Sequence, residues 1–247
     1  MVTPIYLRSL SFVGVILGSF ALATNVCAQQ YNGPIVIPAG PGNTTLAVGV
    51  KALADDRYQD AINAITPAIS QISSPGLLAT AYANRGVAYC ALDRTAQGVS
   101  DYEAAIAQVS NAAEIYAAAG ACMFRAGQDS KARDYFQRGM KACPPHRLLM
   151  NDYAWFLATC PNSAFRDGKQ ALVLATKAHD RTRNDGSYLD TLAAAEAEAG
   201  AFDKAVEHEQ LALAAKNVAP KLRANFEPRL KKYRNHQPFH ERPTEKY

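Results

Sequence analysis

The sequence predicts an all-α protein in which about five helical hairpins stack into a solenoid. Two observations support this fold class: the chain is alanine-rich with a helical pattern from Asn43 onward, and small residues recur at a step close to 34 residues. A chain of 247 residues with 49% hydrophobic and 19% charged residues has the composition of ordinary soluble proteins. Its net charge of +4 is too small to indicate nucleic-acid binding.

The repeat is visible first in five small residues spaced by 37, 34, 34 and 39 positions, which are Gly49, Gly86, Gly120, Ala154 and Ala193. Two further small residues follow each of them at fixed intervals, with five extra residues in the fourth unit: Ala61 and Ala68, Gly98 and Ala105, Ala132 and Gly139, Ala171 and Ala178, Ala205 and Ala212. Antiparallel helices approach closely only where no bulky side chain intervenes. The pattern therefore predicts helical hairpins over 43–76, 79–112, 113–146, 147–185 and 186–219.

Residues 82–106 and 188–215 form the clearest units, and each resembles a tetratricopeptide repeat. In the third unit, small, aromatic and turn residues and a terminating proline stand where that family has them: Gly120, Gly127, Ala132, Phe136 and Pro144. The resemblance covers residues 43–219 and implies a right-handed α-solenoid that binds other proteins in its concave groove. Residues 151–172 resemble a variant repeat of bacterial exported or sensory proteins, with a longer loop between its helices.

Some positions depart from the family pattern. Asp55 and Asp56 stand where a turn glycine is usual, and Pro67 predicts that the second helix of the first unit is kinked or short. A stack of hairpins needs a terminal cap, and residues 220–235 fit a capping helix, bent or divided at Pro228. Residues 236–247 are expected to form a loose tail.

The first 28 residues have the features of a secretory signal peptide. Arg8 precedes an apolar run of fourteen residues from Leu10, and small residues end the segment before a predicted cleavage after Ala28. The run is shorter than the about 20 residues that a membrane-spanning helix needs. The sequence therefore predicts an exported protein of the periplasm or cell envelope, with an extended Pro/Gly-rich leader over 29–42.

Four cysteines remain after removal of the signal peptide: Cys90, Cys122, Cys143 and Cys160. Cys90 and Cys122 lie on first helices of adjacent units and could bond if their sulfurs face each other. Cys143 and Cys160 lie at opposite ends of a helix that rises about 18 Å, which is too far for a disulfide. Our preferred interpretation is four buried thiols that act as small hydrophobic side chains.

No catalytic motif, cofactor-binding loop or metal-ligand spacing is present, so we expect no enzyme activity, cofactor, metal or small-molecule substrate. The only enzymatic alternative uses Asp152, Asp167 and Lys169 near the long loop of the fourth unit. The family pattern instead places a partner-binding set in the concave groove: Val50, Asn84, Val87, Phe124, Arg125, Asn151, Trp155, Asp190 and Glu198. Trp155 fits equally a groove anchor or a filler between neighbouring helices.

Some tetratricopeptide-repeat proteins hold C-terminal carboxylates with a Lys, Asn and Arg set, but here only Asn84 matches it. Leu46, Val50, Glu114 and Ala118 occupy the other positions, so a carboxylate clamp is disfavoured. The sequence thus indicates a non-catalytic interaction module that takes a hydrophobic segment of a protein partner. The alternative is an architectural envelope subunit whose basic C-terminal helix contacts an acidic partner or a membrane surface.

Overall fold

The structure is a computed structural model that describes residues 42–180, 185–218 and 223–240. Within these ranges the chain forms eleven α-helices and one short 3-10 helix, and no β-strand. Ten of the α-helices pair as hairpins: α1 (Asn43–Ala54) with α2 (Tyr58–Ile69), α3 (Pro75–Ala91) with α4 (Thr95–Gln108), α5 (Ala113–Arg125) with α6 (Asp129–Ala142), α7 (Arg147–Thr159) with α8 (Gly168–His179), and α9 (Gly186–Glu198) with α10 (Phe202–Ala214). The last helix, α12 (Phe226–Arg234), packs against α10.

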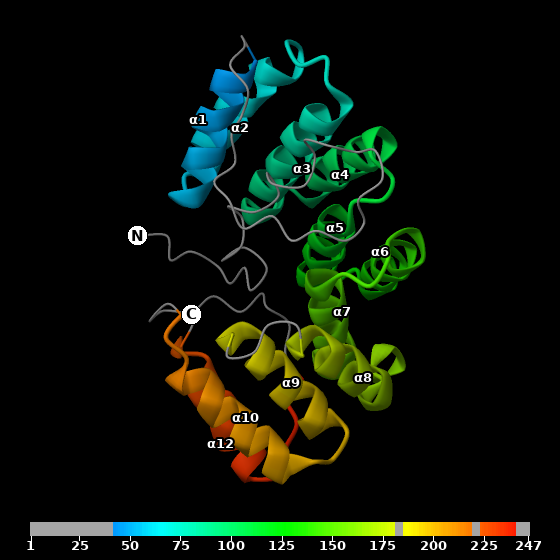
Figure 1. Ribbon diagram of the computed structural model, residues 1–247, viewed down its shortest axis with the longest axis vertical. Helices are drawn as coiled ribbons and strands as arrows, with labels where there is room; N and C mark the ends of the chain where they lie inside the picture. The colour runs from blue at the N-terminus through cyan, green and yellow to red at the C-terminus, as the bar shows by residue number, and fades with distance from the viewer. Residues whose placement is uncertain (1–41, 181–184, 219–222, 241–247) are drawn as a thin grey trace.

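The hairpins stack side by side into a C-shaped solenoid (Figure 1). The first helices α3, α5, α7 and α9 contact one another in sequence and line its concave side, and α4, α6 and α8 lie on the convex side. The predicted all-α solenoid of five hairpins with a C-terminal cap is confirmed.

Small residues permit the close contact within each hairpin. A Cβ atom at Gly120 would come within 2.6 Å of the Phe136 ring, and one at Gly49 within 2.4 Å of the Ile65 side chain. Gly86 approaches the backbone of the opposing helix, since a Cβ atom there would lie 3.1 Å from the carbonyl oxygen of Gly98. These contacts explain why the small residues recur in phase.

The turn between the helices of a hairpin needs one residue with positive φ. Gly127 (φ 73°) and Gly200 (φ 84°) supply it in the third and fifth hairpins. Asp56 (φ 57°) and Asp93 (φ 60°) supply it in the first and second, because aspartate tolerates the left-handed conformation better than most residues. The first turn therefore forms without the glycine that is usual there.

Pro67 lies within α2, and Pro228 lies within α12. Helix α2 extends two residues past Pro67 and has 12 residues, as α1 does, so the proline does not shorten it. Pro228 lies in the first turn of α12, where the missing amide hydrogen needs no intrahelical partner. Helix α12 spans Phe226–Arg234 and is therefore shorter than the capping helix predicted over 220–235.

The predicted signal peptide and almost all of the leader lie outside the described residues, as do residues 241–247. Among the helices that are described, none combines the length and apolarity needed to cross a membrane.

Candidate functional site

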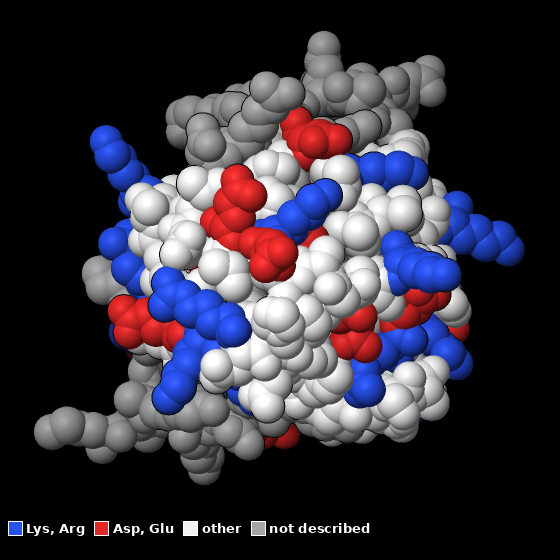
Figure 2. Space-filling view, turned by 90° about the horizontal axis from the view of Figure 1, so that it is seen from below, with Lys and Arg blue, Asp and Glu red and all other residues white. Residues whose placement is uncertain are grey.

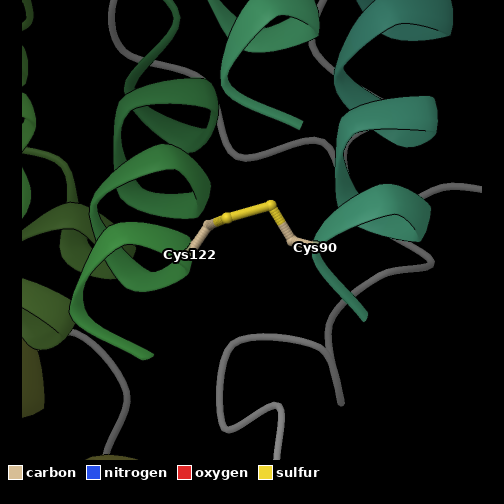
Figure 3. Close-up of a disulfide and its surroundings, with 2 residues drawn as sticks. All are labelled: Cys90 and Cys122. Atoms are coloured by element: carbon tan, nitrogen blue, oxygen red, sulfur yellow. A yellow bond between two sulfur atoms is a disulfide. The ribbon is translucent and has the colours of Figure 1, made fainter. Parts of the chain in front are cut away.

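The concave side is cross-linked by a disulfide between α3 and α5 (Figure 3). Cys90 and Cys122 have Cα atoms 5.9 Å apart, and both residues are buried. The preference for four thiols was therefore wrong for this pair, because adjacent first helices bring the two side chains face to face. Cys143 and Cys160 are buried and form no disulfide, as predicted.

The groove positions near the N-terminal end are deeply buried. Val50, Asn84 and Val87 are at most 8% exposed. The Asn84 side chain donates from Nδ2 to the carbonyl oxygen of Thr80 at 2.9 Å. Its Oδ1 atom accepts no hydrogen bond from any described residue. An amide oxygen buried without a donor is costly, and Asn84 is 0% exposed, so a partner could reach this atom only if its cover moved.

Arg125 ends α5 and is only 6% exposed. Burial lowers the pKa of its guanidinium, although Tyr102, Asp93 and Tyr58 act in the opposite direction. No described residue accepts a hydrogen bond from its Nη1 atom. The preceding Phe124 packs edge-on against Phe156 with ring centroids 5.1 Å apart, so its ring belongs to the core between α5 and α7.

Asn151 and Trp155 lie on α7. Asn151 donates from Nδ2 to Asp152 Oδ1 at 3.2 Å, while its own Oδ1 atom has no partner among the described side chains and backbone. Trp155 is 7% exposed, and the guanidinium of Arg229 from α12 lies 4.9 Å from the centre of its ring. The capping helix therefore reaches the predicted groove.

Arg229 also forms an ion pair with the predicted groove residue Asp190. Its Nη1 donates to both carboxylate oxygens of Asp190, at 3.1 and 3.2 Å, and the two side chains are 7% and 0% exposed. A buried carboxylate needs such a partner, so Asp190 anchors the cap to α9. The Asp190 carboxylate, which was expected to orient a partner, is therefore already paired with Arg229.

Residues after α12 continue along the same surface instead of forming a loose tail. Phe239 lies against Trp155 with ring centroids 5.9 Å apart, and its ring also meets Arg229 at 4.8 Å. His240 Nε2 pairs with Glu198 Oε2 at 2.5 Å. The prediction of a loose tail was therefore wrong for 236–240, because this segment carries aromatic and imidazole groups that fit the end of the groove.

Glu198 is held from a second side by the loop of the fourth hairpin. Arg166 donates from Nε to Glu198 Oε1 at 2.9 Å and from Nη1 to the carbonyl oxygens of Cys160 and Pro161. The long loop, which includes the 3-10 helix η3 (Ser163–Phe165), is thus tied to the end of α9. Glu198 is therefore paired within the molecule on both carboxylate oxygens, with Arg166 and with His240.

Comparison with solved structures identifies the fold. A tetratricopeptide-repeat protein of the thermophile Thermus thermophilus, TTC0263, is similar over 76% of this chain and 98% of its own, with a TM-score of 0.61 and 14% identity. PilW, a type IV pilus biogenesis factor, is similar over 79% of this chain and 86% of its own, with a TM-score of 0.62 and 14% identity. The chain has the tetratricopeptide-repeat fold.

A chain of the APC/C hetero-tetramer Cut9–Hcn1 is similar to this tetratricopeptide-repeat solenoid as well. The similarity covers 79% of this chain but only 36% of the other, with a TM-score of 0.65 and 17% identity. No protein-family model matches the sequence, and no curated protein matches it.

Two of the described basic residues near the C-terminus bond to groups within the protein. Arg229 turns inward to Asp190, and Arg223 donates to the carbonyl oxygens of Ala215 and Val218. Figure 2, which looks at the molecule from below, shows blue basic side chains interspersed with red acidic ones. A surface of mixed charge attracts anionic partners less than a continuous basic patch does.

The residues of the enzymatic alternative have structural contacts. Asp167 caps α8 by accepting from the backbone amide of Gln170 at 2.9 Å. Asp152 is 8% exposed and accepts from Asn151. Across 42–180, 185–218 and 223–240, no three His, Cys, Asp or Glu side chains lie together as metal ligands.

Sequence reasoning missed four residues that complete the C-terminal end of the groove, namely Arg166, Arg229, Phe239 and His240. One signal pointed to them: Phe239 is a large apolar residue in an otherwise polar tail, and such residues rarely remain in solvent. The repeat pattern ends before this segment, so it gave no position for these side chains.

Proposed function

We propose that this chain of tetratricopeptide-repeat fold is a non-catalytic interaction module that receives a segment of a protein partner in its concave groove. One observation carries the proposal: the groove already holds a segment, because residues 236–240 lie against α7 and α9 through Phe239 and His240. A surface that accepts its own chain in this way has the shape and chemistry to accept another.

The polar groups toward the N-terminal end support the same interpretation. Asn84, Arg125 and Asn151 each have a buried polar atom without a hydrogen-bond partner among the described residues. Because these atoms are inaccessible to solvent, a partner backbone could satisfy them only if binding moved the groups that cover them. The apolar side chains around them favour a partner segment with hydrophobic residues. These three residues would orient the partner, and Trp155 would anchor it.

The absence of catalysis is part of the proposal. Asp167 serves as a helix cap, and the Asp152 carboxylate lies buried beside Asn151. An active site needs a nucleophile, a base and a stabilising group within reach of one another, and the sequence contains no motif that assembles them.

Export is proposed on two grounds. The N-terminal segment has the order of charge, apolar run and small residues typical of a cleaved signal. The Cys90–Cys122 disulfide is also of the kind that persists in oxidising compartments such as the periplasm. Expression of the full gene should give an envelope fraction whose intact mass corresponds to a chain that begins at Gln29; a cytoplasmic chain that keeps residues 1–28 would contradict it.

The groove is tested by affinity capture from envelope extract with the wild-type chain, Trp155→Ala and Arg125→Met. Lys177→Ala, which removes an exposed cation from α8, is the matched control. We expect a partner that the wild type and the control retain and that both groove variants lose, with unchanged helical circular dichroism. A partner that stays on both groove variants but leaves when residues 223–247 are deleted would instead support the architectural subunit anchored by its C-terminal end.

A further inference from the structure

The C-terminal end of the groove contains a compact set of aromatic and cationic side chains. The ring centre of Trp155 lies 4.9 Å from the guanidinium carbon of Arg229, and that carbon lies 4.8 Å from the ring centre of Phe239. Lys232 adds a second cation, 5.8 Å from the centre of the Phe239 ring. A cation over an aromatic face is attracted to the ring electrons. These contacts therefore join α7, α12 and the segment that follows α12.

The members of this set differ in how firmly they are held. Arg229 is anchored by its buried pair with Asp190, and Trp155 stands on α7 in the core of the solenoid. Phe239 and His240 follow the last helix and are only half-buried. Residues 236–240 can therefore leave without disturbing the ion pair that fastens the capping helix.

The contacts of this segment are those of a bound peptide. Phe239 inserts its ring beside Trp155, His240 places its Nε2 on the Glu198 carboxylate, and His236 stacks on Phe202 with ring centroids 5.2 Å apart. The glutamate is fixed for this role by Arg166, which holds its other oxygen. An aromatic ring and an adjacent imidazole thus meet a preformed aromatic surface and a preformed carboxylate.

We propose that residues 236–240 act as an intramolecular ligand that blocks the C-terminal end of the groove. A partner segment of the same chemistry, an aromatic side chain followed directly by one that can donate a hydrogen bond to a carboxylate, must displace them. This proposal rests on the proposed function, since it names the class of partner that the groove accepts and the contact that restrains its binding. Only molecules whose own segment has left the groove can bind such a partner. The apparent affinity is therefore the intrinsic affinity multiplied by the fraction of molecules in that open state.

Trp155 is the only tryptophan of the chain, so its fluorescence reports this contact directly. Phe239→Ala should shift its emission maximum to longer wavelength and increase its quenching by acrylamide, because the indole loses its cover. Lys231→Ala, an exposed cation on α12, is the control and should change neither quantity. His240→Ala, which removes the link to Glu198, should shift the emission in the same direction as Phe239→Ala.

The second measurement uses a fluorescent peptide that copies residues 234–240. Its anisotropy should report binding to the Phe239→Ala chain at least about ten-fold tighter than to the wild type. Adding Trp155→Ala to that variant, or replacing the phenylalanine of the peptide by alanine, should abolish binding. Circular dichroism of each variant establishes that the solenoid remains folded.

Three results would overturn the proposal: unchanged Trp155 emission in Phe239→Ala, equal peptide affinity for the wild type and this variant, or no binding of the peptide to the variant. None of these affects the capture test above, which depends on Trp155 and Arg125. Failure of the intramolecular ligand and failure of the interaction module are therefore distinguishable.

Discussion

Reduction of the Cys90–Cys122 disulfide should lower the stability of the solenoid substantially. The bond closes a loop with a sequence separation of 32 residues between the first helices α3 and α5. Loop-closure entropy for that length corresponds to about 3.7 kcal/mol at 25 °C. Cys90 and Cys122 are 2% and 5% exposed, and the thiols formed on reduction can act as small hydrophobic side chains, so we expect little packing to be lost. For a chain of this size, the loss corresponds to a decrease of about 10 °C in melting temperature.

The assay is urea unfolding followed by circular dichroism, with and without reductant, on the wild type and on Cys90→Ala/Cys122→Ala. Thiol titration in denaturant should find two more thiols after reduction than before. The double variant should resemble the reduced wild type and should not respond to reductant. Cys143→Ala, which removes a buried thiol outside the disulfide, is the control and should keep the full response. An unchanged unfolding midpoint after complete reduction would refute the reasoning.

Two further substitutions test the packing and electrostatics of the hairpins. Gly120→Ala should lower the free energy of unfolding by about 1–3 kcal/mol, measured by urea unfolding, because its Cβ would lie within 2.6 Å of the Phe136 ring; recovery in Gly120→Ala/Phe136→Leu would identify that clash as the cause. The hydrogen bond to Glu196 raises the pKa of His208 above its ordinary value of 6.5, so the folded chain binds this proton more tightly than the unfolded one. The stabilisation should be complete below pH 6.5 and disappear as pH rises through the raised pKa. For a partly exposed ion pair it is at most about 1 kcal/mol, and His208→Gln should remove this part of the pH dependence of the melting temperature.

The architecture could be predicted from the sequence because it follows from a repeated local requirement. Gly49, Gly86 and Gly120 each lie where a first helix touches its second helix, so the packing constraint recurs with the repeat and is visible in the residue types. The five hairpins follow from that periodicity, and the terminal helix follows from the need of the stack for a cap. Aspartates at two turns did not disturb it, because a positive φ at Asp56 and Asp93 is sufficient for the turn.

The groove was less predictable, because its chemistry depends on contacts between segments distant in sequence. Arg229 reaches Asp190 and Trp155 from the last helix, and Phe239 follows it to the same place. No periodic pattern reports such pairs. The disulfide was left open for the same reason: the spacing of Cys90 and Cys122 placed them on adjacent helices but not on facing sides.

These contacts divide the concave surface into two parts with different properties. Around α3 and α5, a covalent bond fixes two neighbouring first helices, and Asn84 Oδ1 and Arg125 Nη1 have no hydrogen-bond partner among the described residues. Around α7 and α9, residues 236–240 cover part of the surface. They are held there by the contacts of Phe239 with Trp155 and of His240 with Glu198. Binding to the rigid part is strengthened because that part is preorganised. Binding to the occupied part is weakened by the free energy needed to displace residues 236–240. A partner that spans both parts would therefore bind first where the groove is rigid and then compete for Trp155, so that its final affinity depends on how firmly Phe239 is held.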